Sequence, residues 1–175
     1  MTSNDEITRV LKARAQTLAR EPVQSVAEAT LEVVEFQLAN ERYGIETAFV
    51  RGVQPLRDLT PLPCTPAFVR GIINVHGKIL AVIDLKMFFD LPEEGLHDLH
   101  RVLIMQTADV ELGILADSVG GNRSIPLSAL QPALPTLTGV RAEYLKGVTA
   151  DRLIVLDAAT ILADKRIIVH EEVET

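Results

Sequence analysis

The sequence predicts a mainly β protein built from two small barrels of related sequence. Three observations favour this fold class. Many short apolar runs are separated by turn residues, the two halves of the chain share a motif, and the long crossover helices that a parallel sheet needs are missing. Closing each sheet into a barrel also removes strand edges that would otherwise be exposed.

The first 30 residues are expected to form an amphipathic helix followed by a linker. Apolar side chains recur at three- and four-residue steps from Ile7 to Leu18, Ser3 and Glu6 have the spacing of a capping box, and Pro22 ends the pattern. A helix of about fifteen residues is marginal on its own in water, so its apolar stripe needs a surface to pack on. Two alternatives stay open: the helix docks on its own domain, or it binds a partner.

The chain from residue 31 to residue 165 is typical of short strands. Val34, Phe36 and Leu38 alternate with polar residues, which predicts a strand with one buried face. Two apolar runs flank His76 and Gly77, which suits a tight hairpin with a glycine at positive φ. Later elements are expected as strands at Val102–Gln106, Leu112–Ala116, Leu145–Thr149 and Leu153–Leu156, a short helix at Ala158–Lys165 and an acidic tail at 166–175.

The two halves share a motif that reads aromatic, aliphatic, basic, glycine, aliphatic. It occurs at Phe68–Ile72 and again at Tyr144–Val148. Each copy is followed by a turn and by an apolar run that ends in an aspartate, Asp84 or Asp157. The repeat predicts two related units, one barrel each, at about 31–90 and 101–165.

Composition excludes several classes of function. The 175 residues are 47% hydrophobic and 23% charged, and the net charge of −7 argues against a non-specific grip on nucleic acid or an anionic membrane. One cysteine cannot form an internal disulfide, and no apolar run approaches the roughly 20 residues that span a bilayer. No phosphate-binding glycine loop or nucleophile elbow occurs. We therefore expect a cytoplasmic protein with no catalytic residues, no metal and no cofactor.

Asp84 and Asp157 are the strongest candidates for catalysis. Duplicated barrels that each present an aspartate also occur in pepsin-like proteases, where two carboxylates share one proton. That chemistry needs an Asp-Thr/Ser-Gly turn, whereas the residues that follow here are Leu-Lys and Ala-Ala. We interpret each aspartate as the N-cap of the short helix behind it, which contributes about 1 kcal/mol. A duplicated-barrel aspartyl hydrolase is the enzyme alternative.

Several stretches keep a recognisable order and spacing between residues 31 and 165. They are Val34–Ile45, Leu62–Phe68, Gly71–Gly77, Val82–Leu85, Glu143–Gly147 and Leu153–Asp157. Together they resemble the CheW family of chemotaxis coupling adaptors. The resemblance implies two five-stranded SH3-like barrels and a non-catalytic adaptor that bridges a methyl-accepting chemoreceptor tip to the regulatory domain of a CheA-type histidine kinase. It also implies a location at receptor arrays near the inner membrane.

Two positions depart from the family pattern. The family has an arginine where this chain has His76, and a glutamate in the preceding strand where this chain has Gly52. Losing both members of an opposite-charge pair can be nearly neutral for the fold, but it changes the expected receptor contact. We therefore expect a divergent or pathway-specific adaptor, or a CheW-like competitor that binds kinase or receptor without coupling them. The partner-binding residues that the resemblance implies are Val50, Gly52, Val53, Ile73, Asn74, His76 and Gly77.

Overall fold

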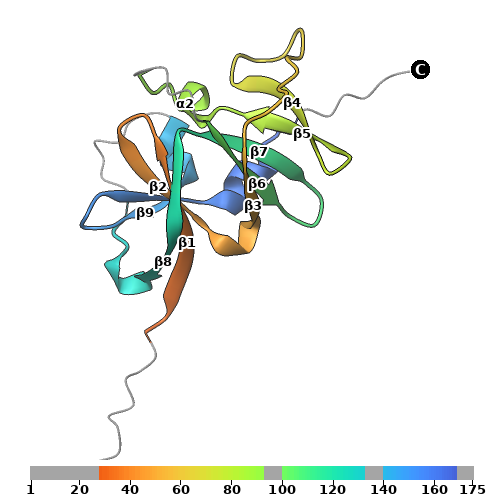
Figure 1. The fold of residues 1–175 in the computed structure, drawn as a ribbon. Coiled ribbons are helices and arrows are strands. Elements are labelled where there is room, and N and C mark those ends of the chain that lie inside the picture. The colour runs from red at the N-terminus through yellow and green to blue at the C-terminus, as the bar shows by residue number, and fades with distance from the viewer. Residues whose placement is uncertain (1–27, 93–99, 133–139, 169–175) are drawn as a thin grey trace, which may run out of the picture.

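The computed structural model describes residues 28–92, 100–132 and 140–168, and the expected amino-terminal helix and most of the acidic tail lie outside them. The strands form two five-stranded sheets (Figure 1). In spatial order, sheet A contains β8 (Ser118–Pro126), β1 (Thr30–Leu38), β2 (Glu41–Glu46), β10 (Leu153–Leu156) and β9 (Leu145–Val148). Sheet B contains β3 (Val50–Pro55), β6 (Arg101–Gln106), β7 (Glu111–Ala116), β5 (Lys78–Ile83) and β4 (Val69–Val75). The mainly β fold class is thereby confirmed.

The helices are short. They are α2 (Leu85–Phe88) and α3 (Ala158–Ala163), with 3-10 turns η1 (Thr47–Phe49), η2 (Leu127–Ala129) and η3 (Val140–Tyr144). In the part of the chain that the structure describes, no helix combines the length and apolar character needed to cross a bilayer.

The two sheets do not coincide with consecutive units at 31–90 and 101–165. Sheet B contains the unbroken series β3 to β7, whereas sheet A combines β1 and β2 with β8, β9 and β10. Each repeat therefore gives its first two strands to one sheet and its last three to the other. A sequence repeat identifies which strands are alike, but long-range pairing decides which sheet each strand joins.

Each sheet closes on itself through the segment that follows one of its edge strands. After β3 the chain turns back, and Thr60 pairs with Ile72 of β4, the opposite edge, through hydrogen bonds of 2.9 and 2.8 Å. Gln131 pairs with Val148 of β9 in the same way, at 3.0 and 2.9 Å. Both sheets thus become small barrels.

The closing segments explain the glycine of the shared motif. A Cβ atom on Gly71 would overlap the backbone of Thr60, and one on Gly147 would lie 2.9 Å from the carbonyl oxygen of Gln131. Gly71 also has a φ of +142°, which side chains rarely adopt. The repeated glycine is therefore the place where each barrel closes.

Three apolar clusters hold the fold together. One small cluster fills each barrel, and a large third cluster lies between them. On β6, Val102 and Ile104 point into barrel B, while Leu103 and Met105 belong to the cluster between the barrels. Burial on both faces explains why central strands read as continuous apolar runs rather than as alternating ones.

Strand β8 was not predicted from the sequence, because it is an edge strand with little buried surface. Most of its residues are polar or small and exposed, with Gly120 and Gly121 side by side, and Ile125 is its one buried residue. The expected strands at β1, β6, β7, β9 and β10 are present. The turn between β1 and β2 consists of Ala39 and Asn40, and Ala39 has a φ of 52°.

The two aspartates of the repeat are N-caps, as predicted. The Asp84 carboxylate accepts a hydrogen bond from the Lys86 backbone N–H at 2.9 Å, and Asp157 accepts one from Thr160 at 3.1 Å. These hydrogen bonds satisfy backbone N–H groups in the first turn of each helix, which have no acceptor within the helix.

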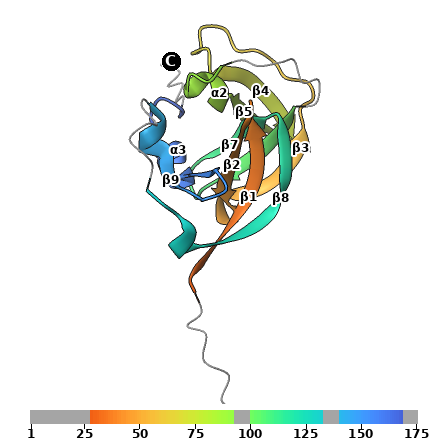
Figure 2. The same ribbon diagram turned by 90° about the vertical axis from the view of Figure 1, so that its left-hand side faces the viewer.

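Figure 2 shows α3 at one side of the molecule. A cluster of polar and aromatic side chains fixes the segment that follows it. The buried Tyr144 hydroxyl donates to Asp164, and Arg166 pairs with Asp164 at 2.9 Å while lying over the Phe88 ring at 5.3 Å from its centroid. Burial, followed by the Asp164 carboxylate, raises the pKa of Tyr144 to about 12. The Arg166 hydrogen bonds hold the pKa of Asp164 well below its usual range.

Replacing Gly71 tests barrel closure. Gly71→Ala is expected to lower the free energy of unfolding by about 3 kcal/mol, because the methyl group meets the Thr60 backbone and the φ is unfavourable. Gly52→Ala is the control, since no atom lies within 4 Å of its Cβ position. Urea denaturation of both variants measures the difference, and equal stabilities would contradict this account of closure.

The Asp164 cluster gives a pH dependence. Because the folded-state pKa is below the unfolded value of about 3.9, the stabilisation is present above about pH 4 and is lost as the pH falls through the folded value. At neutral pH Asp164→Asn is expected to cost about 1 kcal/mol, since Arg166 is half exposed. In acid, the difference in free energy of unfolding between this variant and the wild type becomes smaller. The exposed Asp109→Asn is the control in denaturation at both pH values, and a gap that does not change with pH would be evidence against the cluster.

Candidate partner-binding surface

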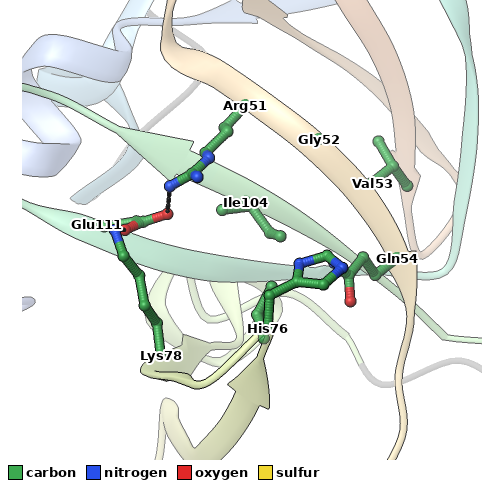
Figure 3. A pocket seen from close by; sticks show the side chains of 9 residues that line it. Arg51, Gly52, Val53, Gln54, His76, Lys78, Ile104 and Glu111 are labelled. Atoms are coloured by element: carbon green, nitrogen blue, oxygen red, sulfur yellow. Dashed lines mark hydrogen bonds and ion pairs between the residues drawn. The ribbon is translucent and has the colours of Figure 1, made fainter.

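The predicted partner-binding residues gather where barrel B opens. At one end this barrel is closed by the Thr60 and Ile72 pair, and at the other β3 separates from the β4–β5 hairpin. A hollow of about 350 Å³ lies in this gap and is lined by Gly52 and Val53 from β3 and by His76 from the hairpin turn (Figure 3). We call this gap the barrel B opening.

The hairpin turn has the expected geometry. Val75 pairs with Lys78, so the turn consists of two residues, His76 and Gly77, with φ values of 51° and 86°. The Asn74 side chain accepts a hydrogen bond from the Gly77 N–H at 2.8 Å. Positive φ at both central residues is the twist that suits a two-residue hairpin, and it sets His76 on the rim of the opening.

The remaining predicted residues lie around the same opening, though not all in one hollow. Asn74 and Ile73 line a second hollow of about 350 Å³ beside it, next to Gln54. The Ile73 side chain is only 5% exposed because it belongs to the core of barrel B, so it supports the surface rather than forming it. Val50 lies on the other side, in a different hollow.

That third hollow is a groove of about 490 Å³ at the junction between η1 and β3. It is lined mainly by small and apolar residues, Ala48, Phe49, Val50 and Ala108 among them. Phe49 and Val50 also pack against the large cluster between the barrels. We call it the η1 groove.

Sequence reasoning missed the charges at the barrel B opening. Glu111 of β7 pairs with Arg51 at 2.7 Å and with Lys78 at 3.2 Å, and both cations converge on it in Figure 3. The hydrogen bond from Lys78, helped by Arg51, lowers the pKa of Glu111. The three residues are far apart along the chain, and only the proximity of Arg51 to Gly52 and of Lys78 to Gly77 could have drawn attention to them.

Asp84 and Asp157 play no part in these surfaces. Each carboxylate caps its own helix, Asp84 is almost fully buried, and neither lines any of the three hollows. The arrangement is that of two structural caps at equivalent positions of a repeat.

Comparison with known proteins gives a consistent result. The model of the CheW-like domain matches residues 32–166. The chain is 32% identical over 150 residues to the chemotaxis protein CheW of Treponema pallidum, covering 82% of this chain and 88% of that protein. It is 35% identical over 114 residues to the protein FrzA of Myxococcus xanthus, covering 65% and 70%.

A solved structure agrees with the sequence comparisons. The scaffolding protein TtCheW from Thermoanaerobacter tengcongensis matches with a TM-score of 0.66 and 30% identity, over 73% of this chain and 89% of that one.

Proposed function

Because the chain belongs to the CheW-like domain family and is a non-catalytic chemosensory coupling adaptor, we propose that it joins a CheA-type histidine kinase to a chemoreceptor. Its work is scaffolding, and no covalent bond is made or broken. The observation that carries the proposal is that one compact chain offers two different surface hollows, the barrel B opening and the η1 groove.

We assign the η1 groove to the cytoplasmic tip of the receptor. The groove is apolar along Ala48, Phe49 and Val50 and is larger than the opening, which suits the apolar stripe of a helix. We assign the barrel B opening to the regulatory domain of the kinase, since a charged gap at the end of a barrel suits packing against another folded domain.

Gly52 and His76 make this adaptor a specialised one. With neither a glutamate on β3 nor an arginine in the turn, the opening carries a different charge pattern from the one that the family resemblance implies. This favours a variant that serves a particular kinase and receptor. The function also implies a cytoplasmic position at receptor arrays near the inner membrane, where both partners lie.

A ternary complex distinguishes an adaptor from a competitor. The purified chain is expected to bind the regulatory domain of its CheA-type kinase and a receptor-tip fragment, each with micromolar affinity, on the order expected for interfaces of about 1,200 Å² or less. Because the two hollows share only Arg51 among their lining residues, all three proteins should co-elute in size-exclusion chromatography. If each partner instead displaces the other, the chain is a competitor.

Rebuilding the family-like pair tests whether these positions set partner choice. The double variant Gly52→Glu with His76→Arg is expected to change the affinity for the kinase domain by about tenfold or more, or ~1.4 kcal/mol, because an internal ion pair would then span the opening. Gly52→Ala with unchanged His76 is the control for adding a side chain. Calorimetric titration with both partners measures the effect, and unchanged affinities would mean that these positions do not determine partner choice.

A further inference from the structure

The two barrels provide an internal comparison, because β3 and β8 occupy equivalent places. Each strand ends in a Pro-Leu pair, and that leucine donates its backbone N–H to the segment before the neighbouring strand: Leu56 to His100 at 3.0 Å, and Leu127 to Ala29 at 2.9 Å. Counting back three residues from each proline makes Gly52 of β3 the counterpart of Arg123 of β8.

In barrel A, Arg123 spans the gap between β8 and the opposite hairpin. Its guanidinium makes two hydrogen bonds to the carboxylate of Asp151 in the β9–β10 turn, at 2.7 and 3.1 Å. The hydrogen bond from Arg123, followed by one from Thr149, holds the pKa of Asp151 well below its usual range. Paired, two-pronged contacts of this kind are the stronger class of ion pair. Barrel A therefore fills this gap with its own side chains.

Barrel B has a different arrangement: Arg51 of β3 is joined to Lys78 of β5 through Glu111, and position 52 contributes no side chain. Gly52 stands where Arg123 would be, and no atom lies within 4 Å of the position of its Cβ. Among the residues that the structure describes, no ion pair joins β3 directly to His76 or Gly77 in the turn. The backbone of β3 at Gly52 is bare in Figure 3, beside the hollow of about 350 Å³.

The charge at the barrel B opening is positive, against the net charge of −7 of the whole chain. Arg51 and Lys78 share one carboxylate, Glu111, so the group carries one uncompensated positive charge. Both cations remain accessible, with 52% and 60% of their side chains exposed. A ligand that enters the hollow thus meets surplus positive charge with His76 opposite.

We propose that the barrel B opening takes an acidic side chain of the docked protein partner, which supplies the charge bridge that Arg123 and Asp151 supply in barrel A. The proposal rests on the proposed function, with the kinase regulatory domain as the partner. A protein fits better than a free anion because Val53, which follows Gly52 on β3, is an exposed apolar residue at the edge of the hollow. The partner's carboxylate lies between β3 and Lys78.

A pair of variants with equal shape and different charge tests the proposal. Gly52→Glu and Gly52→Gln both fit, because the site is open and needs no positive φ. Gly52→Glu is expected to weaken binding of the kinase regulatory domain at least about tenfold more than Gly52→Gln does, since its carboxylate takes the place of the partner's. Equal losses in calorimetric titration would mean that only space matters and would overturn the proposal.

Reversing a charge gives the second test. Lys78→Glu is expected to weaken binding at least about tenfold and to reduce the dependence of affinity on salt, whereas Lys146→Glu is expected to change affinity less than about twofold. Lys146 is the matched control, since it also pairs with a partly exposed glutamate, Glu46, but lies on β9. Carbodiimide cross-linking of the complex should join Lys78 to an aspartate or glutamate of the partner.

The outcomes separate the two claims. Suppose that the wild-type chain binds the kinase regulatory domain, and that Lys78→Glu binds it as tightly as Lys146→Glu or more tightly. That result overturns the proposed acidic occupant and leaves the adaptor function unaffected. A wild-type chain that binds neither partner overturns the adaptor function and this inference with it.

Discussion

The structure depends on the burial of both faces of the strands at the centre of each sheet. On β6 one face fills barrel B and the other packs between the barrels, and β10 divides its side chains in the same way in sheet A. Neither barrel could keep the shared cluster out of water alone. Because β1 and β2 also join a sheet completed by β8, β9 and β10, the two barrels are tied by chain connections as well as by packing. We infer that they fold as one cooperative unit.

Local features of the fold could be predicted from the sequence, and long-range ones could not. The two N-caps, the His76-Gly77 turn and most strands follow from spacing within a few residues. The exchange of strands does not, because nothing in a repeat specifies whether a hairpin pairs with its own unit or with the other. Strand β8 has too little buried surface to leave an apolar pattern.

The candidate site shows the same division. Resemblance to a family indicated Gly52 and His76, and the structure brings them to one opening. The ion pairs of Glu111 could not be foreseen, since they join β3, β5 and β7 across the barrel. Of the two equivalent gaps, one contains the Arg123–Asp151 bridge and the other has Gly52 in place of the arginine.

Arg51 lines both the η1 groove and the barrel B opening, because the two hollows begin on successive residues of β3. One guanidinium therefore lies between the places assigned to the two partners. Under the proposed function, a receptor helix bound beside Arg51 would change the electric field at Glu111, where the kinase domain would dock. Thermodynamic linkage would then make this influence reciprocal, so that a bound kinase domain would change the affinity for the receptor by the same factor.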